Sequence, residues 1–266
     1  MANKKTFSSL SQTETELIAR LVYEKKEIVT AKELDSFLPA DFSYRRQLVF
    51  RLKTKNILIP IKSGTYIFVP LESVPTGRRI SEFIIPSVYF PKGDYYVGYS
   101  TMFNYYSFTD QQFQKVYVIN TRLSKEKKIA GILFKFINVS QAQMYGIEKK
   151  LIKGVNVCMS SKEKTLVDLI YFNKPVGGFL SAGEIVKRFV TEKKCDIKKL
   201  IDYVVRFPNI KTRKYMGYIL EKCEISDALL RPLVKSVKET SIASLSESRK
   251  GALNKKWRII INDTRR

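Results

Sequence analysis

Three short helix-like segments followed by a β-rich hairpin fill the first seventy residues, and this order constrains the fold more than any other feature of the chain. Apolar residues recur there at helical spacing, and two runs of β-branched and aromatic residues follow. Lys62-Ser63-Gly64 joins these runs as a short turn. We expect helices over residues 11–24, 31–38 and about 42–55, and strands over residues 57–61 and 65–69. This order is the outline of a winged helix-turn-helix.

Apolar spacing and capping residues define the first two helices. In the first, Leu17, Ile18, Leu21 and Val22 recur at helical spacing. Thr30 precedes the second helix and can accept a hydrogen bond from a free backbone N–H, while Glu33 completes a capping box. A turn at Pro39-Ala40-Asp41 then leads into the third helix.

The third expected helix has two different faces. At about 100° per residue, Tyr44, Leu48 and Leu52 share the side that should face the core. The opposite side gathers Ser43, Arg46, Gln47, Phe50, Lys53 and Thr54, with Arg45 on the flank. Arginine can pair with guanine, glutamine with adenine and lysine with phosphate. This helix is therefore the expected DNA-reading element.

The candidate DNA-binding residues come from this helix and from the tip of the hairpin. They are Ser43, Arg45, Arg46, Gln47, Lys53 and Lys62. Phe50 lies on the same face and has two interpretations, contact with a thymine methyl group or packing beneath the hairpin. A protein–protein module of the same fold is the alternative to DNA binding, and the basic side chains favour DNA.

The net charge points to a polyanionic partner. The chain carries 48 basic and 25 acidic side chains, a formal net charge of +23. Residues 1–80 hold 14 basic and 8 acidic side chains, residues 81–160 hold 10 and 5, and residues 161–266 hold 24 and 12. The positive excess is therefore not confined to the N-terminal segment. Self-repulsion at this charge favours nucleic acid as a partner.

Residue usage argues against the common enzyme chemistries. The chain has no histidine, which excludes His-based acid–base catalysis, Ser-His-Asp and Cys-His arrangements, and the usual zinc sites. Cys158, Cys195 and Cys223 are far apart in sequence and suit buried thiols in a reducing compartment. With no long apolar run or signal-like start, we expect no membrane contact and a cytoplasmic location. We expect no catalytic residue, no metal and no cofactor.

A second domain is expected beyond a linker. Residues 1–72 form the expected winged helix, residues 73–80 a linker of Pro, Gly and charged residues, and residues 81–266 the second domain. Strands and helices mix up to about residue 172, and the rest is mainly helical. The expected fold class is thus α+β: an N-terminal winged helix-turn-helix followed by a mixed α/β domain with a helical C-terminal part.

Several elements of the second domain can be predicted individually. Expected strands cover residues 115–120, 129–139 and 155–157, and a short helix covers residues 100–106. Helix caps are expected at Ser160 or Ser161, at Ser181 with Glu184, at Asp196 and at Asn209. The tyrosine-rich stretch around residues 95–106 is expected to be an aromatic core rather than a stacking platform for single-stranded nucleic acid.

The helical part also carries a cluster of basic residues with two open interpretations. The cluster consists of Lys198, Lys199, Arg206, Lys211, Arg213 and Lys214. It is either a second polyanion-binding surface or a set of ordinary solvated helix faces.

Several segments in this order resemble the AbiEi family, the antitoxins of type IV toxin–antitoxin systems. They are the Gly64-x-Tyr66 hairpin, residues 98–111 (Gly-Tyr-Ser-Thr-Met-Phe-Asn-Tyr-Tyr-Ser-Phe-Thr-Asp-Gln), the strand 116–121, residues 161–168 (Ser-Lys-Glu-Lys-Thr-Leu-Val-Asp) and residues 254–262. The likeness spans most of the chain. The helix that starts at Ser161 is its most specific piece.

The resemblance implies a function for each half. Such antitoxins repress their own operon by cooperative binding to inverted repeats in its promoter. Their C-terminal domain neutralises a nucleotidyltransferase-like toxin, and direct contact with the toxin is not required. The DNA-contact role maps onto the third helix and the hairpin, and no antitoxicity residue can be carried over.

The alternative is a nucleic-acid-processing enzyme, nuclease-like, that a winged helix targets to its substrate. Metal-dependent nucleases use an acidic residue beside a Glu-x-Lys set. Glu126-Lys127-Lys128 and Glu148-Lys149-Lys150 have that spacing, but both lie in lysine-rich stretches without an obvious acidic partner. The sequence therefore favours the regulator.

Overall fold

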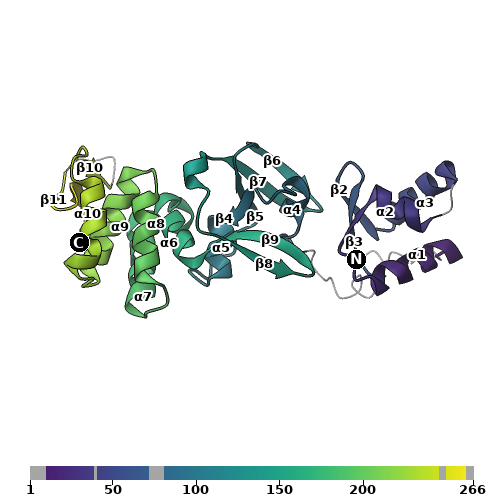
Figure 1. Ribbon diagram of the computed structural model, residues 1–266, viewed down its shortest axis with the longest axis horizontal. Helices are drawn as coiled ribbons and strands as arrows, with labels where there is room; N and C mark the ends of the chain where they lie inside the picture. Colours follow the sequence, from purple (N-terminus) through teal and green to yellow (C-terminus); the bar gives the residue numbers. More distant parts are fainter. Residues whose placement is uncertain (1–9, 39–40, 72–80, 246–249, 262–266) are drawn as a thin grey trace, which may run out of the picture. The chain divides into compact units, whose positions relative to one another are not determined.

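The structure, a computed structural model, describes residues 10–38, 41–71, 81–245 and 250–261. Contacts divide the chain into two compact units. The first takes in the described part of Met1–Lys92 together with residues 127–133 and 151–157, and the second takes in the remainder. Both helices and sheets are present, so the fold class is α+β, as expected (Figure 1). The expected linker, residues 73–80, lies outside the described residues.

In the first unit, four helices accompany a small antiparallel sheet of strand order β1-β3-β2. The elements are α1 (Gln12–Tyr23), β1 (Ile28–Thr30), α2 (Ala31–Phe37), α3 (Phe42–Thr54), β2 (Leu58–Lys62), β3 (Thr65–Phe68) and α4 (Ile85–Tyr89). The three expected helices and two expected strands are all present. Strand β1 was not expected, and it pairs with β3 from Ile28↔Ile67 to Thr30↔Thr65.

Capping and burial explain where these helices lie. Both capping boxes form, Ser11 with Glu14 on α1 and Thr30 with Glu33 on α2. The core of the unit includes Leu17, Leu21, Leu48 and Leu52, each at most 3% exposed. Val22, although it shares the helical spacing, does not join it and is 44% exposed. It lies about 100° around the helix from Leu21, beyond the buried face.

The hairpin is held to the start of α2 by backbone contacts. Gly64 adopts φ +66°, a left-handed conformation that glycine accepts without steric cost. Its carbonyl oxygen accepts a hydrogen bond of 2.8 Å from the N–H of Ala31, the first residue of α2. Pro60 lies on β2, the edge strand, where its missing N–H costs no ladder bond.

Beyond Lys92 the chain forms a six-stranded sheet of order β6-β7-β5-β4-β9-β8. The strands are β4 (Tyr95–Gly98), β5 (Lys115–Asn120), β6 (Lys125–Ile129), β7 (Ile132–Asn138), β8 (Ile147–Ile152) and β9 (Val155–Ser160), with α5 (Ser100–Tyr105) after β4. Strand β4 is buried along its whole length. It pairs antiparallel with β5 and parallel with β9, and it therefore lies inside the sheet.

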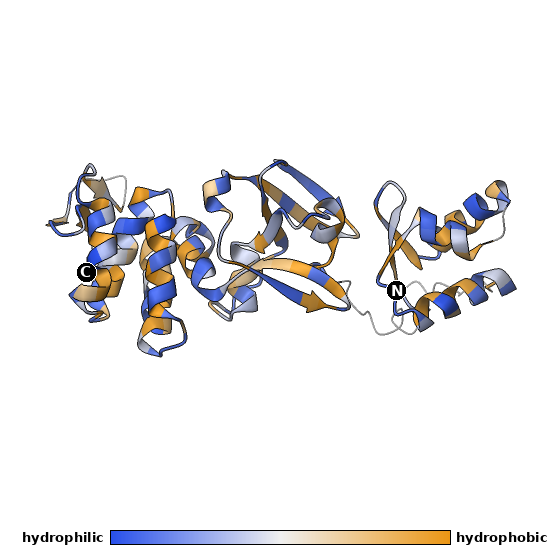
Figure 2. Cartoon of the chain, viewed as in Figure 1, coloured by the Kyte–Doolittle hydropathy of each residue, from blue (hydrophilic) through white to orange (hydrophobic). Residues whose placement is uncertain are grey.

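The two lysine-rich stretches are edge strands, which the sequence did not predict. Residues 129–139, expected to be one strand, are instead parts of β6 and β7 joined at Ala130-Gly131. Lys153-Gly154 joins β8 to β9 in the same way, and all four residues have positive φ, as a two-residue type I′ hairpin turn requires. Strand β6 is hydrophilic except for its last residue, the buried Ile129, whereas β9 is largely hydrophobic (Figure 2). Charged edges of this kind discourage pairing with other chains.

The tyrosine-rich stretch is core, as expected. Tyr95, Tyr96 and Tyr99 are at most 3% exposed, and the ring of Tyr99 stacks on Phe172 at 4.7 Å. Tyr105 is the exception, at 42% exposed. Burial therefore leaves little aromatic surface there for nucleic-acid bases.

Five helices and a small sheet complete the chain. They are α6 (Lys162–Tyr171), α7 (Phe179–Thr191), α8 (Ile197–Arg206), α9 (Ile210–Lys222), α10 (Asp227–Val237), and the strands β10 (Ala243–Ser244), β11 (Ala252–Asn254) and β12 (Ile259–Ile261). Ser161, Asp196 and Asn209 cap α6, α8 and α9 as expected. The predicted cap at Ser181 is wrong, because the N-cap of α7 is Gly178, three residues earlier, at φ +94°.

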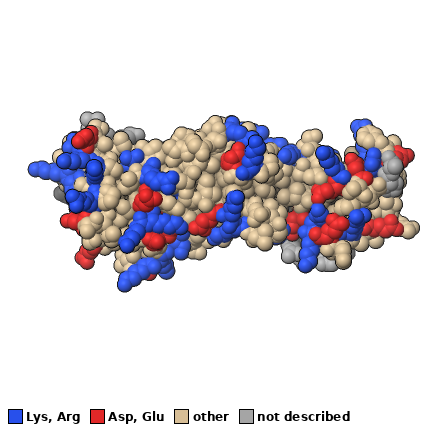
Figure 3. Space-filling model, viewed as in Figure 1, with Lys and Arg blue, Asp and Glu red and all other residues tan. Residues whose placement is uncertain are grey.

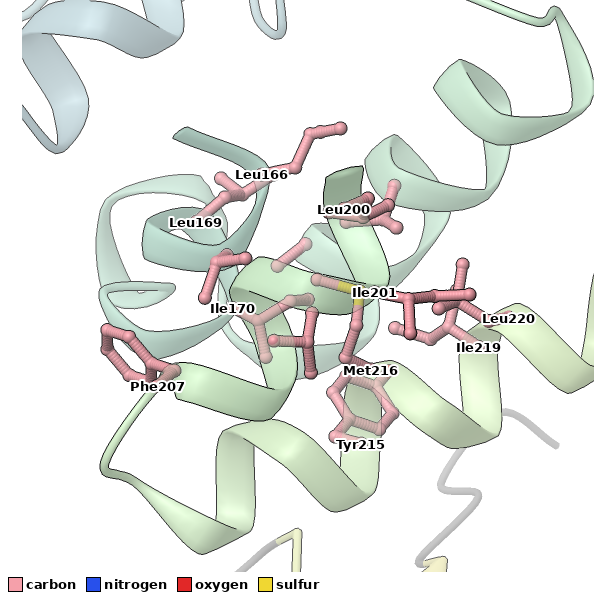
Figure 4. Packing of buried hydrophobic residues seen from close by; sticks show 14 of the residues in the cluster. Leu166, Leu169, Ile170, Leu200, Ile201, Phe207, Tyr215, Met216, Ile219 and Leu220 are labelled. Carbon is pink, nitrogen blue, oxygen red and sulfur yellow. The ribbon is translucent and has the colours of Figure 1, made fainter. Parts of the chain in front are cut away.

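Apolar side chains of α6, α8 and α9 meet in one cluster. Figure 4 shows Leu166, Leu169, Ile170, Leu200, Ile201 and Met216 among those that point into the space between these helices. Trp257 also belongs to the cluster and is 0% exposed. Its ring lies against Gly217 of α9, where an added Cβ would come within 2.1 Å of the indole. Glycine at position 217 therefore allows the C-terminal strand region to pack on α9.

A fully buried ion pair lies at the start of this core. Lys164 and Asp168, one turn apart on α6, are 0% and 1% exposed and are joined at 2.5 Å. The rings of Tyr96, Tyr145 and Phe207 surround the Lys164 ammonium at 5.1–5.4 Å from their centroids. Aromatic faces stabilise a cation that has lost its water. The Lys162-Glu163-Lys164 run that opens α6 is thus part of the fold.

Asp168→Asn should destabilise the second unit by about 3–5 kcal/mol, because it leaves the Lys164 ammonium buried without its counter-ion. Urea unfolding followed by Trp257 fluorescence measures this selectively, since the chain has one tryptophan and it lies in this unit.

The matched control is Asp202→Asn, which breaks the exposed i,i+4 pair with Arg206. Exposed pairs of this type contribute at most about 1 kcal/mol. Adding Lys164→Met to Asp168→Asn should recover much of the loss, since no unpaired charge then remains. Equal effects of Asp168→Asn and Asp202→Asn would contradict the proposed role of the buried pair.

Candidate nucleic-acid interface

Helix α3 presents one continuous exposed face. Asp41 caps the helix by accepting a 3.0 Å hydrogen bond from the N–H of Tyr44. Leu48 and Leu52 are 0% exposed and fix the inner side. The opposite side, called here the exposed face of α3, consists of Phe42, Ser43, Arg46, Gln47, Phe50, Lys53 and Thr54. Four of the six predicted DNA-binding residues therefore lie together: Ser43, Arg46, Gln47 and Lys53.

A buried carboxylate on α1 fixes the rotation of α3. Glu14 is 1% exposed, and its oxygens accept hydrogen bonds from Arg51 Nε at 3.0 Å and Lys55 Nζ at 2.7 Å. The N–H of Ser11 donates to the same carboxylate at 2.9 Å. Burial alone would raise the pKa of Glu14, but the hydrogen bonds from Lys55, Ser11 and Arg51 outweigh it and hold the pKa below its usual value.

Glu14 holds two basic residues at the C-terminal end of α3, Arg51 and the C-cap residue Lys55. Both side chains reach the Glu14 carboxylate of α1, Lys55 at 18% exposure and Arg51 at 40%, so Arg51 still borders the exposed face. Sequence reasoning did not single out Glu14, although its place between Leu21 and Ile18 on the helical wheel indicated burial.

Arg45 lies apart from the exposed face. Its Nε is 3.5 Å from Asp35 Oδ1 of α2, and its side chain is 21% exposed. Arg45 therefore joins α2 to α3, which leaves it less surface than Arg46 for contact with a ligand.

Lys62 ends β2 beside the hairpin turn and is exposed. Its Nζ donates a 2.6 Å hydrogen bond to the carbonyl oxygen of Val88, within the same unit. An ammonium has three N–H donors, so this bond occupies one of them and the charge is retained.

Two phenylalanines break the polar character of the exposed face. Phe42 is 71% and Phe50 is 67% exposed. The interpretation that Phe50 packs beneath the hairpin is therefore wrong. Sequence reasoning did not single out Phe42, although its position eight residues before Phe50 placed it on the same side of the helix.

Two shallow depressions follow this face. One is lined by Ser43, Arg46, Gln47, Phe50 and Arg51. The other runs between α2, α3 and β3, where apolar residues such as Leu34 and Tyr66 accompany Phe42, Phe50 and Lys53. The walls thus combine hydrogen-bond donors, positive charge and apolar surface, the three properties that base edges, phosphates and thymine methyl groups require.

Most of the basic cluster in the helical part is engaged by the protein itself. Lys211 Nζ donates to Leu245 O, Arg213 Nε to Phe207 O, and Lys214 Nζ to Ser241 O. Burial lowers the pKa of all three side chains. Lys199 pairs with Glu148 and Glu163, and Arg206 with Asp202. These contacts favour a structural role over a second polyanion-binding surface.

Other lysines and arginines remain spread over the surface of the helical part. Figure 3 shows their side chains over this region with fewer acidic ones among them. No group of three or more potential metal ligands among His, Cys, Asp and Glu occurs in the described residues. Within the same residues, every helix is too short or too polar to cross a membrane.

Comparison with known proteins identifies a similar fold. The crystal structure of RV2827C protein from Mycobacterium tuberculosis superposes with a TM-score of 0.67 at 12% sequence identity, over 95% of this chain and 92% of that chain. This similarity covers nearly all of both chains and shows a shared α+β architecture. No protein-family model and no curated protein matches the sequence.

Glu14→Gln should lower the stability of the first unit by about 2 kcal/mol, because hydrogen bonds to a charged group contribute about 1.5–3 kcal/mol. The folded-state pKa of Glu14 is lowered from 4.5. Its contribution to stability is therefore complete above the unfolded-state value and is lost as pH falls through the folded-state pKa. In the Glu14→Gln variant, the free energy of unfolding should no longer contain this pH-dependent contribution.

Urea unfolding at several pH values, followed by far-UV circular dichroism and by Trp257 fluorescence, measures the effect. The dichroism transition should shift while the Trp257 transition stays, since Trp257 belongs to the other unit. Glu16→Gln, an exposed change two residues along α1, is the control. If the two variants behave alike, the buried carboxylate does not hold α3.

Proposed function

We propose that this protein is a DNA-binding antitoxin that represses its own toxin–antitoxin operon. In this proposal the N-terminal module is a winged helix-turn-helix and α3 enters the major groove of inverted repeats in the promoter. The observation that carries the proposal is the exposed face of α3, which places Ser43, Arg46, Gln47 and Lys53 outside while Leu48 and Leu52 hold the other side in the core.

The chemistry of this face matches a duplex. The major groove admits an α-helix and displays a distinct pattern of donors and acceptors for each base pair. Arg46 can donate two hydrogen bonds to one guanine, and Gln47 can both donate to and accept from adenine. Lys53, nearer the end of the helix, suits a phosphate. The hairpin β2–β3 with Lys62 would follow the backbone beside the groove.

The antitoxin part of the proposal rests on the family resemblance. By that resemblance, the C-terminal domain neutralises a nucleotidyltransferase-like toxin without requiring a stable complex. Residues 161–168, its most specific segment, lie in a buried part of the second unit. We therefore expect this segment to shape the domain, with toxin neutralisation carried by surface residues elsewhere.

A nuclease-like enzyme remains the alternative. Its candidate carboxylates are already paired with lysines, Glu126 with Lys115 and Lys135, and Glu148 with Lys199. This pairing favours the regulator. Incubation of purified protein with Mg²⁺ and either duplex or single-stranded DNA distinguishes the two functions. If the protein cleaves DNA and the substitution of one carboxylate abolishes the cleavage, the protein is an enzyme.

Arg46→Ala should weaken binding to the DNA upstream of the protein's own reading frame by about 1–3 kcal/mol and relax base preference. Lys53→Ala should weaken binding to any duplex and reduce the slope of log K against log salt by about one. Fluorescence anisotropy titrations over a range of salt concentrations measure both quantities.

Lys25→Ala removes an equal charge from an exposed site between α1 and β1 and is the matched control. It should leave base preference unchanged. Wild-type binding by both the Arg46 and Lys53 variants would mean that DNA is bound elsewhere. Equal losses in all three variants would mean that only net charge matters.

Co-expression with a nucleotidyltransferase-like toxin, the kind that the family resemblance implies, tests the antitoxin role. The full chain should restore growth, and a variant with both Arg46→Ala and Lys53→Ala should still restore it while losing repression of a promoter fusion. If the full chain neutralises the toxin and this variant does not, the antitoxin activity belongs to the N-terminal module. Co-purification of the two proteins would point to direct sequestration.

A further inference from the structure

We propose that Phe42 and Phe50 read thymine methyl groups, so that the exposed face of α3 selects thymines on both sides of a guanine. This inference rests on the proposed DNA-binding function and gives it a sequence preference. Among the described residues, these two phenylalanines are the large apolar side chains of α3 that are more than 60% exposed.

Nothing in the described part of the first unit accounts for the exposure of the two rings. Burying a phenylalanine contributes about 1.5–3 kcal/mol, and the apolar core formed by Leu48 and Leu52 lies on the opposite side of the same helix. Phe42 and Phe50 line the depressions on this face, so a ligand seated there would contact them. Their neighbours identify the ligand: Arg46 and Lys53 are positively charged, which suits a polyanion with apolar groups on its surface.

Duplex DNA is a polyanion that carries apolar groups in its major groove. The C5-methyl of thymine is the apolar feature of the major groove, and phenylalanine is among the side chains that contact it. A second protein is the competing occupant of an apolar surface. The cationic residues between and beside the two rings make DNA the better match, because an apolar helix docking there would leave these charges without partners.

The spacing along α3 predicts a pattern. Phe42, Arg46 and Phe50 follow one another at i, i+4 and i+8, so they form a single row with the arginine in the middle. Eight residues of helix rise about 12 Å, and base pairs on one strand are spaced about 3.4 Å. A helix lying along the groove would therefore place the two rings about three to four base pairs apart, with the Arg46 guanine between them.

Selection of bound duplexes from a randomised pool by the full-length protein tests this pattern, which should appear as thymines at that separation around a guanine. The decisive step replaces the selected thymines with deoxyuridine, which removes only the methyl groups. Wild-type affinity should fall roughly fourfold for each methyl lost, the equivalent of about 0.8 kcal/mol for one buried CH₂.

Phe42→Ala and Phe50→Ala should each bind the thymine duplex more weakly than wild type does. Each variant should also show a smaller difference in affinity between the thymine duplex and the deoxyuridine duplex. Tyr23→Ala is the matched control, since Tyr23 is an 87% exposed aromatic residue on α1, and it should keep the full difference. Circular dichroism of each variant verifies that the fold is intact.

Each outcome has a distinct meaning. If wild-type protein binds both duplexes equally, or if the difference persists in the double phenylalanine variant, the two rings do not read methyl groups and the inference is wrong. If no duplex is selected at all, the proposed DNA-binding function fails instead. Stable self-association that Phe50→Ala abolishes would assign the surface to a protein partner and would also overturn the inference.

Discussion

A charged group removed from water must find a partner, and each unit of this protein is organised around one such pairing. Glu14 joins α1 to α3 through Arg51 and Lys55. Lys164 and Asp168 lie inside the second unit among aromatic rings. Pairs of this kind are often no more stabilising than well-packed apolar residues, but they are costly to leave half-formed. They therefore act mainly by penalising alternative arrangements, such as a rotated α3 or a shifted α6.

Much of the fold could be predicted because its local signals agree with its tertiary packing. Thr30 with Glu33, Ser161, Asp196 and Asn209 are caps whose hydrogen bonds are local, and all of them form. The failures are of another kind. Strands β6 and β8 are charged because they are sheet edges, and an edge is defined by neighbours far away in sequence. The start of α7 depends on the left-handed Gly178, which a cap search centred on Ser181 passes over.

In the candidate site, too, local features could be predicted from the sequence and contacts between distant segments could not. Helical periodicity places Ser43, Arg46, Gln47 and Lys53 on one face, and they do lie on it. Periodicity places Arg45 on the flank of this face, but it does not reveal the contact between Arg45 and Asp35 on another helix that holds Arg45 there. It also does not anticipate that Glu14 would draw Arg51 and Lys55 inward. Positions on a single element can be predicted from sequence, whereas ion pairs between elements depend on how the helices cross.

The basic residues behind the net charge of +23 have two kinds of hydrogen-bond partner, carboxylates and carbonyl oxygens, and these affect the charge differently. Lys199 and Arg206 pair with carboxylates, so their charge is neutralised locally. Lys211, Arg213 and Lys214 donate to carbonyl oxygens, which carry no net charge. Their side chains are held by the fold, yet their positive charge still adds to the field of the molecule. A polyanion can therefore be attracted over a Debye length by residues that never contact it, while in the proposed function contact and sequence selection belong to the few residues exposed on α3.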